Sequence, residues 1–291
     1  MPERITFLSD GLKLAGLLHI PSDMRAGERR PAFVVMHGFG GSMQGGQGAW
    51  AAQALAKWGY VTLQFEFRGC GESEGEKGRI VCLEEVSDAS NAITYLESRP
   101  EVDSKRIAFC GSSLGAAVAI YAAGADERAA AVISQGGWGN GERKFRLQHV
   151  GPEWNRFMKQ LTDGIKQRET TGKSLMVPRF DIVPIPPRLR SYVENDPASI
   201  MHFTAETPLS MFLFQPEEMI GRISPRPVLL LHGARDSVTP SVESIELFKR
   251  AKPPTELHLI EGADHFMFAE SNERVVTLVR DWVAKFFPLS S

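Results

Sequence analysis

The chain has 291 residues, of which 43% are apolar and 23% are charged, and its formal net charge is −2. This composition is typical of a globular protein, and the small charge, without a dominant basic run, argues against a nucleic-acid partner. Its three cysteines lack close C-x-x-C spacing, which favours a reducing compartment, here the cytoplasm, and argues against a zinc site. The apolar runs are too short to span a membrane, and residues 12–20 fit a strand better than a secretion signal.

Short apolar runs alternate along the chain with segments of helical periodicity. Runs at residues 5–8 and 12–20, broken at Asp10-Gly11, predict an antiparallel hairpin. Further strands are expected at 32–36, 60–65, 106–110, 129–134, 228–231 and 256–260, and helices at 49–58, 83–97, 114–123, 241–250 and 273–287. The alternation predicts an α/β fold with a mostly parallel central sheet flanked by helices. Ligands on such sheets bind at the carboxyl ends of the strands.

The alternation breaks in the second half of the chain. Residues 137–224 are rich in aromatic side chains, include the proline-rich run 183–187, and contain no evident strand of the main sheet. Because this segment is too long for a plain loop, we expect it to be an inserted, mainly helical cap. The expected organisation is a core of residues 1–136 and 225–291 with a cap of residues 137–224.

A G-x-S-x-G pattern at Gly111–Gly115 lies between an expected strand and an Ala-rich expected helix. A serine on such a strand-to-helix turn presents its hydroxyl as a nucleophile, which makes Ser113 the candidate. The bland interpretation is a small residue at a helix N-cap. A second match, at Gly71–Gly75, is followed by Glu76, Lys77 and Gly78 and predicts a solvated loop around Ser73.

A serine nucleophile needs a base, and the base needs an orienting acid. His265 is the candidate base, because it lies in the loop directly after the last expected strand. His232 ends its own strand and is expected to pack there. Asp236 is the candidate acid in the loop after residues 228–231. Asp264 is its competitor, but a side chain adjacent to His265 would point away from the imidazole, so we expect it to stabilise the loop.

Acyl transfer also needs donors for the oxyanion. One is expected to be the backbone N–H of Leu114, the residue after the nucleophile. The other is expected to be the backbone N–H of Phe39, in the glycine-rich loop His37–Gly41 that follows the strand at 32–36. The bland interpretation of this loop is a turn without a catalytic role.

Together these residues resemble the α/β-hydrolase superfamily. The matching segments are residues 37–41, 67–73, 111–115, 231–236 and 262–265. Within the superfamily the chain is similar to the esterase and acyl-peptidase-like branch, including feruloyl-esterase-like enzymes. The resemblance implies a serine nucleophile, a histidine base, an orienting aspartate and no cofactor. Glu66 departs from the aspartate usual before the Arg-Gly stretch, and we expect this change to be tolerated.

These observations predict a serine hydrolase that cleaves a carboxylic ester through an acyl-enzyme. The same triad would serve an amide or peptide hydrolase or a carbon–carbon bond hydrolase, and a non-catalytic receptor or scaffold is the alternative of another class. Residues 137–205 carry 11 Lys and Arg against 7 Asp and Glu, which would suit an anionic substrate or a plain solvated surface. The cap aromatics would suit an aromatic acyl group, a homodimer contact or the core of the insertion.

Overall fold

The computed structural model describes residues 1–269 and 272–289, and its main feature is a sheet of eight strands. The strands stand in the order β1 (Glu3–Ser9), β2 (Leu12–His19), β4 (Val61–Phe65), β3 (Arg30–Met36), β5 (Val102–Ser112), β6 (Ala129–Gln135), β9 (Val228–Gly233) and β10 (Thr255–Ile260). From β4 to β10 all neighbours are parallel, and β1 and β2 are antiparallel additions at one edge. The fold predicted from the sequence is confirmed.

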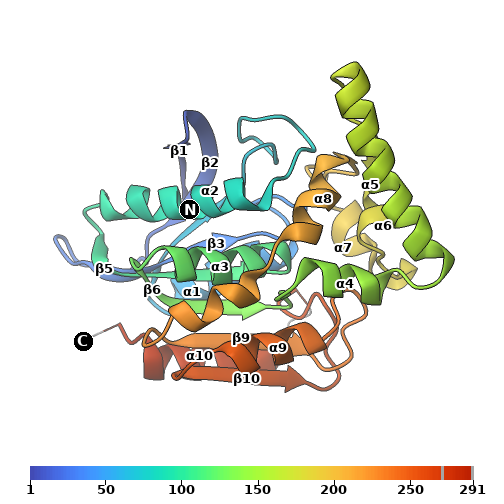
Figure 1. The fold of residues 1–291 in the computed structure, drawn as a ribbon. Coiled ribbons are helices and arrows are strands. Elements are labelled where there is room, and N and C mark those ends of the chain that lie inside the picture. The colour runs from blue at the N-terminus through green and yellow to red at the C-terminus, as the bar shows by residue number, and fades with distance from the viewer. Residues whose placement is uncertain (270–271, 290–291) are drawn as a thin grey trace.

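Helices cover both faces of the sheet (Figure 1). They are α1 (Gly46–Lys57), α2 (Cys82–Glu97), α3 (Leu114–Ala125), α9 (Val242–Arg250) and α10 (Glu273–Phe286). Side chains alternate across each strand, so Val34 joins the core under α2 and α3, whereas Phe33 and Val35 join the core under α1 and α10. All seven residues of β3 are buried, as expected for a strand covered on both sides.

The chain reverses between β1 and β2 in a tight turn. Asp10 and Gly11 both have positive φ angles, of 48° and 83°, which is the backbone of the two-residue hairpin turn that Asp-Gly sequences favour. The predicted hairpin is therefore present, with every residue from Glu3 to Ser9 paired to β2.

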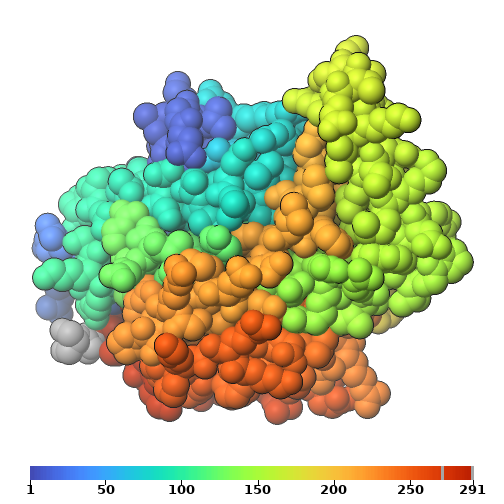
Figure 2. Space-filling view, in the orientation of Figure 1, coloured from blue at the N-terminus to red at the C-terminus, as the bar shows by residue number. Residues whose placement is uncertain are grey.

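Residues between β6 and β9 form a separate group of short elements. These are α4 (Gly141–Gln148), α5 (Pro152–Thr171), β7 (Met176–Pro178), α6 (Arg179–Ile182), α7 (Ser191–Glu194), β8 (His202–Thr204) and α8 (Glu206–Leu213), with three 3₁₀ turns. Helix α5 stands out from the body of the molecule as a ridge (Figures 1 and 2). The small antiparallel pair β7–β8 was not expected from the sequence, because three-residue strands leave no readable pattern.

Three of the cap aromatics belong to the core of the insertion, one of the interpretations of the sequence. Phe145 and Phe157 are buried and stacked on each other, with ring centroids 4.7 Å apart, and Trp138 is buried as well. Tyr192 is exposed, and the homodimer contact stays a prediction. None of the helices in the described ranges is both long and apolar enough to cross a membrane.

Candidate active site

Ser113 occupies the turn between β5 and α3 with a strained backbone. Its φ of 56° and ψ of −116° are rare for a residue with a Cβ, and such strain gathers at functional sites. The Ser113 N–H donates to the carbonyl of Gln135 at the end of β6, at 2.8 Å. The neighbouring strand therefore holds the turn in place.

The two glycines of the G-x-S-x-G pattern are required by packing. A Cβ on Gly111 would collide with the carbonyl oxygen of Gly115, and a Cβ on Gly115 would collide with the carbonyl oxygen of His37. Because neither glycine has a Cβ, α3 can start directly behind the nucleophile turn and lie against the end of β3.

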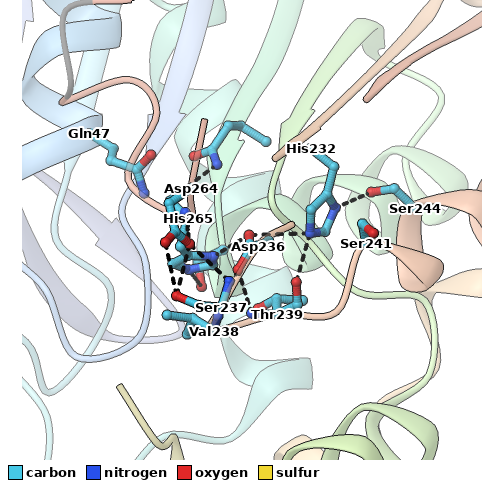
Figure 3. A network of polar contacts seen from close by, with 12 residues as sticks. Gln47, His232, Asp236, Ser237, Val238, Thr239, Ser241, Ser244, Asp264 and His265 are labelled. Carbon is cyan, nitrogen blue, oxygen red and sulfur yellow. Dashed lines mark hydrogen bonds and ion pairs between the residues drawn. The ribbon is translucent and has the colours of Figure 1, made fainter. Parts of the chain in front are cut away.

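Ser113, His265 and Asp236 come together at the carboxyl ends of β5, β10 and β9. His265 Nε2 lies 3.0 Å from Ser113 Oγ, and His265 Nδ1 lies 2.8 Å from Asp236 Oδ2. Figure 3 shows the Asp236 and His265 side chains facing each other. His265 is 2% exposed. With Nδ1–H donating to the carboxylate, Nε2 is free to accept the serine proton.

The Asp236 carboxylate is fully engaged inside the protein. Its Oδ1 accepts from the backbone N–H groups of Val238 and Thr239, both at 2.8 Å. Burial alone would raise the pKa of this carboxyl, but the pairing with His265 and contacts from His232 outweigh burial, so the pKa lies below its usual value. The group is therefore an anion that can hold the imidazole in one orientation.

His232 does more than pack at the end of β9. Its Nε2 lies 2.9 Å from the carbonyl oxygen of Thr239, which only accepts, so Nε2 carries the proton. The same nitrogen lies 3.3 Å from Asp236 Oδ2, and Nδ1 accepts from Ser244 Oγ at 2.7 Å. The fully buried ring therefore braces the acid from the side opposite His265 (Figure 3).

Asp264 lies beside this network without contacting the imidazole ring. Its Oδ1 accepts from the backbone N–H groups of His265 and Ser237, each at 2.8 Å, and its Oδ2 accepts from Arg188. The carboxylate thus ties together the two loops that carry Asp236 and His265.

The loop that carries the expected donor Phe39 lies beside Ser113, because a Cβ on Gly38 would come within 3.2 Å of the Ser113 Cβ. Leu114 is the first residue of α3, so its N–H has no partner within the helix. On the other side, the Gly38 carbonyl accepts from His37 Nδ1 at 2.7 Å and from Gly41 N–H at 3.1 Å. Because the N–H and C=O of a trans peptide point in opposite directions, this pairing turns the Phe39 N–H away from the core.

His37 is fixed as a neutral donor. The Phe67 N–H donates to its Nε2 at 3.2 Å, so the ring proton resides on Nδ1 and faces the Gly38 carbonyl. Burial lowers the pKa of His37 to about 4, so the ring stays neutral at physiological pH.

An open cavity of about 640 Å³ lies over Ser113 and His265. The core supplies residues of the loop 37–48, and the insertion supplies residues between 179 and 199. Its apolar wall contains Val183, Ile185, Tyr192, Val193, Val238 and Phe266. The Tyr192 and Phe266 rings stack with their centroids 4.8 Å apart, which joins the insertion to the His265 loop.

A family model described as serine aminopeptidase, S33 (Hydrolase_4) matches residues 27–272. The chain belongs to this family of α/β hydrolases. The superfamily expected from the motifs is thereby confirmed, and the chain is an enzyme of the hydrolase class. Among the described residues of this α/β hydrolase, no group of three or more His, Cys, Asp or Glu side chains is arranged to hold a metal ion.

Relatives and solved structures cover almost the whole hydrolase. The chain is 28% identical over 312 residues to thiohydrolase aneE of Aspergillus aculeatus, which covers 99% of this chain and 95% of that protein. The crystal structure of hypothetical protein PA2218 from Pseudomonas aeruginosa superposes with a TM-score of 0.84 at 24% identity, covering 99% and 94% of the two chains. Est1E from Butyrivibrio proteoclasticus, solved with ferulic acid bound, gives a TM-score of 0.69 at 19% identity, covering 97% and 98%.

The second G-x-S-x-G serine of the hydrolase is structural. Ser73 was expected in a solvated loop, but it is 2% exposed, donates to the Glu66 carbonyl at 2.6 Å and accepts from the Ala15 N–H at 2.9 Å. Glu72 and residues 74–77 are exposed, so the loop is solvated as expected. The burial of Ser73 itself was not expected, because it depends on contact with the β1–β2 hairpin.

Glu66 and Arg68 brace loops around the site. The Glu66 carboxylate accepts from the Met43 N–H at 3.2 Å and from the Glu72 N–H at 2.6 Å, so the longer side chain still joins the two loops. Arg68 pairs with buried Asp88 and with Asp10. These contacts give Arg68 a bracing role between the loop and the β1–β2 hairpin.

Several residues that contact the site were not found from the sequence. Gln135 donates from its side chain to the His265 carbonyl at 2.9 Å, while its own carbonyl holds Ser113. Arg179 and Asp196 reach the cavity from the insertion. No motif surrounds these three residues, and only their packing in the folded chain gives them a place in the site.

Proposed function

We propose that this hydrolase cleaves carboxylic esters through an acyl-enzyme formed on Ser113. His265 Nε2 takes the hydroxyl proton as Ser113 Oγ bonds to the ester carbonyl carbon, and the carbonyl oxygen becomes an oxyanion facing the N–H groups of Phe39 and Leu114. The carbon–oxygen bond to the alcohol then breaks, and the imidazolium gives its proton to the departing alkoxide. Water repeats the sequence, releases the acid and restores Ser113.

The observation that carries this proposal is the unbroken hydrogen-bonded chain from Ser113 through His265 to Asp236. Its two contacts, of 3.0 and 2.8 Å, lie within the range needed for proton transfer. Ser113 and His265 line a cavity whose lining also includes Phe39. A nucleophile, a base, an orienting acid and oxyanion donors are the parts that acyl transfer requires.

The cavity favours an uncharged, apolar acyl group. Its wall is mainly aliphatic and aromatic, with Tyr192 and Phe266 available to contact an aromatic ring. Asp196 is an acid in its lining, and Nη1 and Nη2 of Arg179 donate to backbone carbonyls. Lys159 and Lys166 of α5 are exposed and do not line the cavity. The net positive charge of the insertion therefore gives no support to an anionic substrate.

The proposal assigns residues 137–224 as a cap over a core of residues 1–136 and 225–291. Its support is the position of the insertion in the sequence, between strands β6 and β9 that pair directly with each other. Tyr192, Val193 and Asp196 of the insertion line the cavity. In this assignment the core supplies the reacting groups and the cap selects the acyl or alcohol group.

A thioester is the second candidate substrate. The observation that favours it is the 28% identity, over nearly the full length, to a protein named a thiohydrolase. The same triad attacks both carbonyls, and a thiolate leaves without needing a proton from His265.

The test combines active-site labelling with matched substrates. The protein is treated with a fluorophosphonate probe and digested, and the modified serine is located by mass spectrometry. Turnover is then compared among p-nitrophenyl butyrate, butyryl thioester and butyryl p-nitroanilide. We expect modification of Ser113 and the fastest turnover with the oxygen ester.

Each of the other outcomes would indicate a different function. Faster thioester turnover would replace the leading candidate with the second, and anilide turnover would indicate an amidase or peptidase. Labelling without turnover would direct the search to carbon–carbon substrates such as diketones. Modification of Ser73, or of no residue, would contradict the proposed nucleophile and favour a receptor on a hydrolase fold.

A further inference from the structure

Arg179, the first residue of α6, is buried against the loop that carries the proposed oxyanion donor. Its side chain is 5% exposed. Nη2 donates to the carbonyl of Phe39, and Nη1 lies 3.3 Å from the carbonyl of Gly40. Nη1 also donates to the Ile200 carbonyl at 2.9 Å. One guanidinium therefore joins two consecutive core carbonyls to a carbonyl of the insertion.

The charge of Arg179 is buried without a paired carboxylate among the described residues. The acid close by, Asp196, accepts instead from Ser42 Oγ at 2.9 Å and from the Ala198 N–H at 3.0 Å. Burial lowers the pKa of Arg179 to about 10, so the group still carries its charge at neutral pH. Because a buried charge without a counter-ion is costly, this residue is better explained by the loop it contacts than by stability.

The loop in question has little rigidity of its own. Residues 38, 40 and 41 are glycines, and Gly40 has a φ of +52°, so the backbone has many accessible conformations when it is not restrained. The core fixes the Gly38 carbonyl through His37. The next carbonyl, that of Phe39, is fixed from the insertion through Arg179. The two peptide planes that flank Phe39 are thus held from opposite sides.

Two further contacts join the same short stretch to the insertion. The Ile200 N–H donates to the Gly40 carbonyl at 3.0 Å. The rings of Phe39 and Phe203 are stacked with centroids 4.1 Å apart and an interplanar angle of 21°. A Cβ at Gly40 would collide with the Phe203 ring, so the approach is as close as the backbone permits.

We propose that Arg179 is a positioning residue that makes the oxyanion hole depend on the docked insertion. Arg179 holds the Phe39–Gly40 peptide, and His37 holds the Gly38–Phe39 peptide, which carries the proposed donor N–H. Without Arg179, the glycine-rich turn after Phe39 samples other orientations, Phe39 shifts with it, and the donor N–H is no longer held toward the substrate oxyanion. A planar fork is required because three carbonyls are bound from different directions, which a lysine ammonium on a single stem does not reproduce as well. This inference rests on the proposed function only in assigning Phe39 as an oxyanion donor.

The test uses the variants Arg179→Met and Arg179→Lys in the full-length protein, with Arg168→Met as the matched control. Arg168 is an exposed arginine of the same insertion whose contacts are to Gly172, Ser174 and Glu206. Three quantities are measured: kcat and KM with p-nitrophenyl butyrate, the rate of Ser113 labelling by a fluorophosphonate, and hydrogen exchange of a peptide covering residues 37–42.

We expect Arg179→Met to lower kcat and the labelling rate by about 100-fold, the scale of losing one oxyanion donor, with KM changed less than about threefold. Exchange at residues 37–42 should rise. Arg179→Lys, which keeps the charge, should lie between this variant and the parent, and Arg168→Met should match the parent. If Arg179→Met melts well below the parent, Arg179→Lys carries the test.

An Arg179 variant that labels and turns over at the parent rate, or that changes KM alone, would overturn the inference. If the parent hydrolyses no ester but its labelling still falls on Arg179→Met, the ester assignment is wrong and the positioning role stands. If the parent neither labels nor turns over, hydrogen exchange decides: faster exchange at residues 37–42 supports the positioning role, and unchanged exchange contradicts it.

Discussion

The two walls of the active site are held in different ways. On the core wall, Asp236 and His265 follow neighbouring parallel strands. Asp236 accepts from the backbone N–H groups of Val238 and Thr239, and the backbone N–H of His265 donates to the Asp264 carboxylate. On the wall formed by the insertion, Arg179 and Asp196 contact the loop at residues 39–45, far away in the sequence. The side chains of the core wall are thus held by residues close to them in the sequence, and those of the other wall contact residues far away in the sequence.

This difference separates two tasks. The groups proposed to make and break bonds follow strands of the sheet, which set their positions, and the insertion adds contacts to the His265 loop through Arg188 and Tyr192. The proposed oxyanion loop lies between the walls and is held from both sides. We therefore expect changes on the core wall to abolish chemistry, and changes on the other wall to alter orientation, selectivity or stability.

The largest effect is expected from Ser113→Ala. Removing the proposed nucleophile should lower kcat by about 10⁴- to 10⁶-fold, because no other group in the triad can form the acyl-enzyme. Steady-state kinetics measures this, with circular dichroism as the check on folding. A loss of less than tenfold on a good substrate would show that the core wall does not carry the chemistry.

The next largest effect is expected from Asp236→Asn. An amide in place of the carboxylate would favour the wrong imidazole tautomer and lower kcat by about 10⁴-fold, as the same change does in a serine-protease triad. Asp264→Asn is the matched change one residue from His265, and its effect should stay below about tenfold. If Asp264→Asn costs more activity than Asp236→Asn, the acid has been assigned to the wrong residue.

A smaller loss is expected from His232→Phe. The phenyl ring keeps the volume but removes the N–H that braces Asp236 and Thr239, and one lost buried hydrogen bond corresponds to roughly 10- to 100-fold in kcat. The control is His258→Phe, because His258 lies on β10 and its Nε2 lies 3.4 Å from the side chain of the surface residue Glu256. A kcat within threefold of the parent would mean that His232 only fills space.

The smallest effect is expected from Lys144→Met in α4. This change should alter the thermal stability and leave kcat unchanged. Lys144 is 1% exposed, its Nζ has no hydrogen-bond partner in the described structure, and it faces the rings of Trp138 and Phe145 at 4.7 and 3.9 Å. Burial lowers the pKa of this lysine from 10.5 to about 7. The buried ammonium therefore destabilises the insertion.

The pH dependence of this effect has a defined sign. Between pH 7 and 10.5 the unfolded chain binds a proton at Lys144 that the folded chain does not, so stability rises with pH across that window. Lys144→Met should raise Tm at pH 7 by at least about 2 °C, the shift that corresponds to roughly 1 kcal/mol. The gain should shrink toward pH 10, and a pH-independent difference in Tm would contradict this explanation.

The core wall was largely predictable from the sequence, and the opposite wall was not. Ser113 is marked by the glycines on either side, and Asp236 and His265 each follow an apolar run, so local patterns and the rule that ligands bind at strand ends were sufficient. Arg179 sits among prolines and aromatics with no pattern around it. Its importance comes from contacts with residues 39 and 40, which only the folded chain establishes.

His232 shows the limit for a residue that lies inside a motif. Its position at the end of β9 was predicted, but no pattern in the sequence decides between a packed ring and a hydrogen-bonded one. That decision depends on Thr239 and Ser244, which come back to the ring through the start of α9. Ser73 is a parallel case, because its burial depends on contact with the hairpin residue Ala15.

The placement of the insertion between two paired strands also fixes an order of assembly during synthesis. Strands β1 to β6 and the Ser113 turn leave the ribosome first, whereas β9, which pairs with β6, follows only after the whole insertion has been made. Closing so long a loop is slow. A nascent chain that stops before β9 therefore has a serine turn but neither Asp236 nor His265, so the cell produces no partly active hydrolase until the last strands join the sheet.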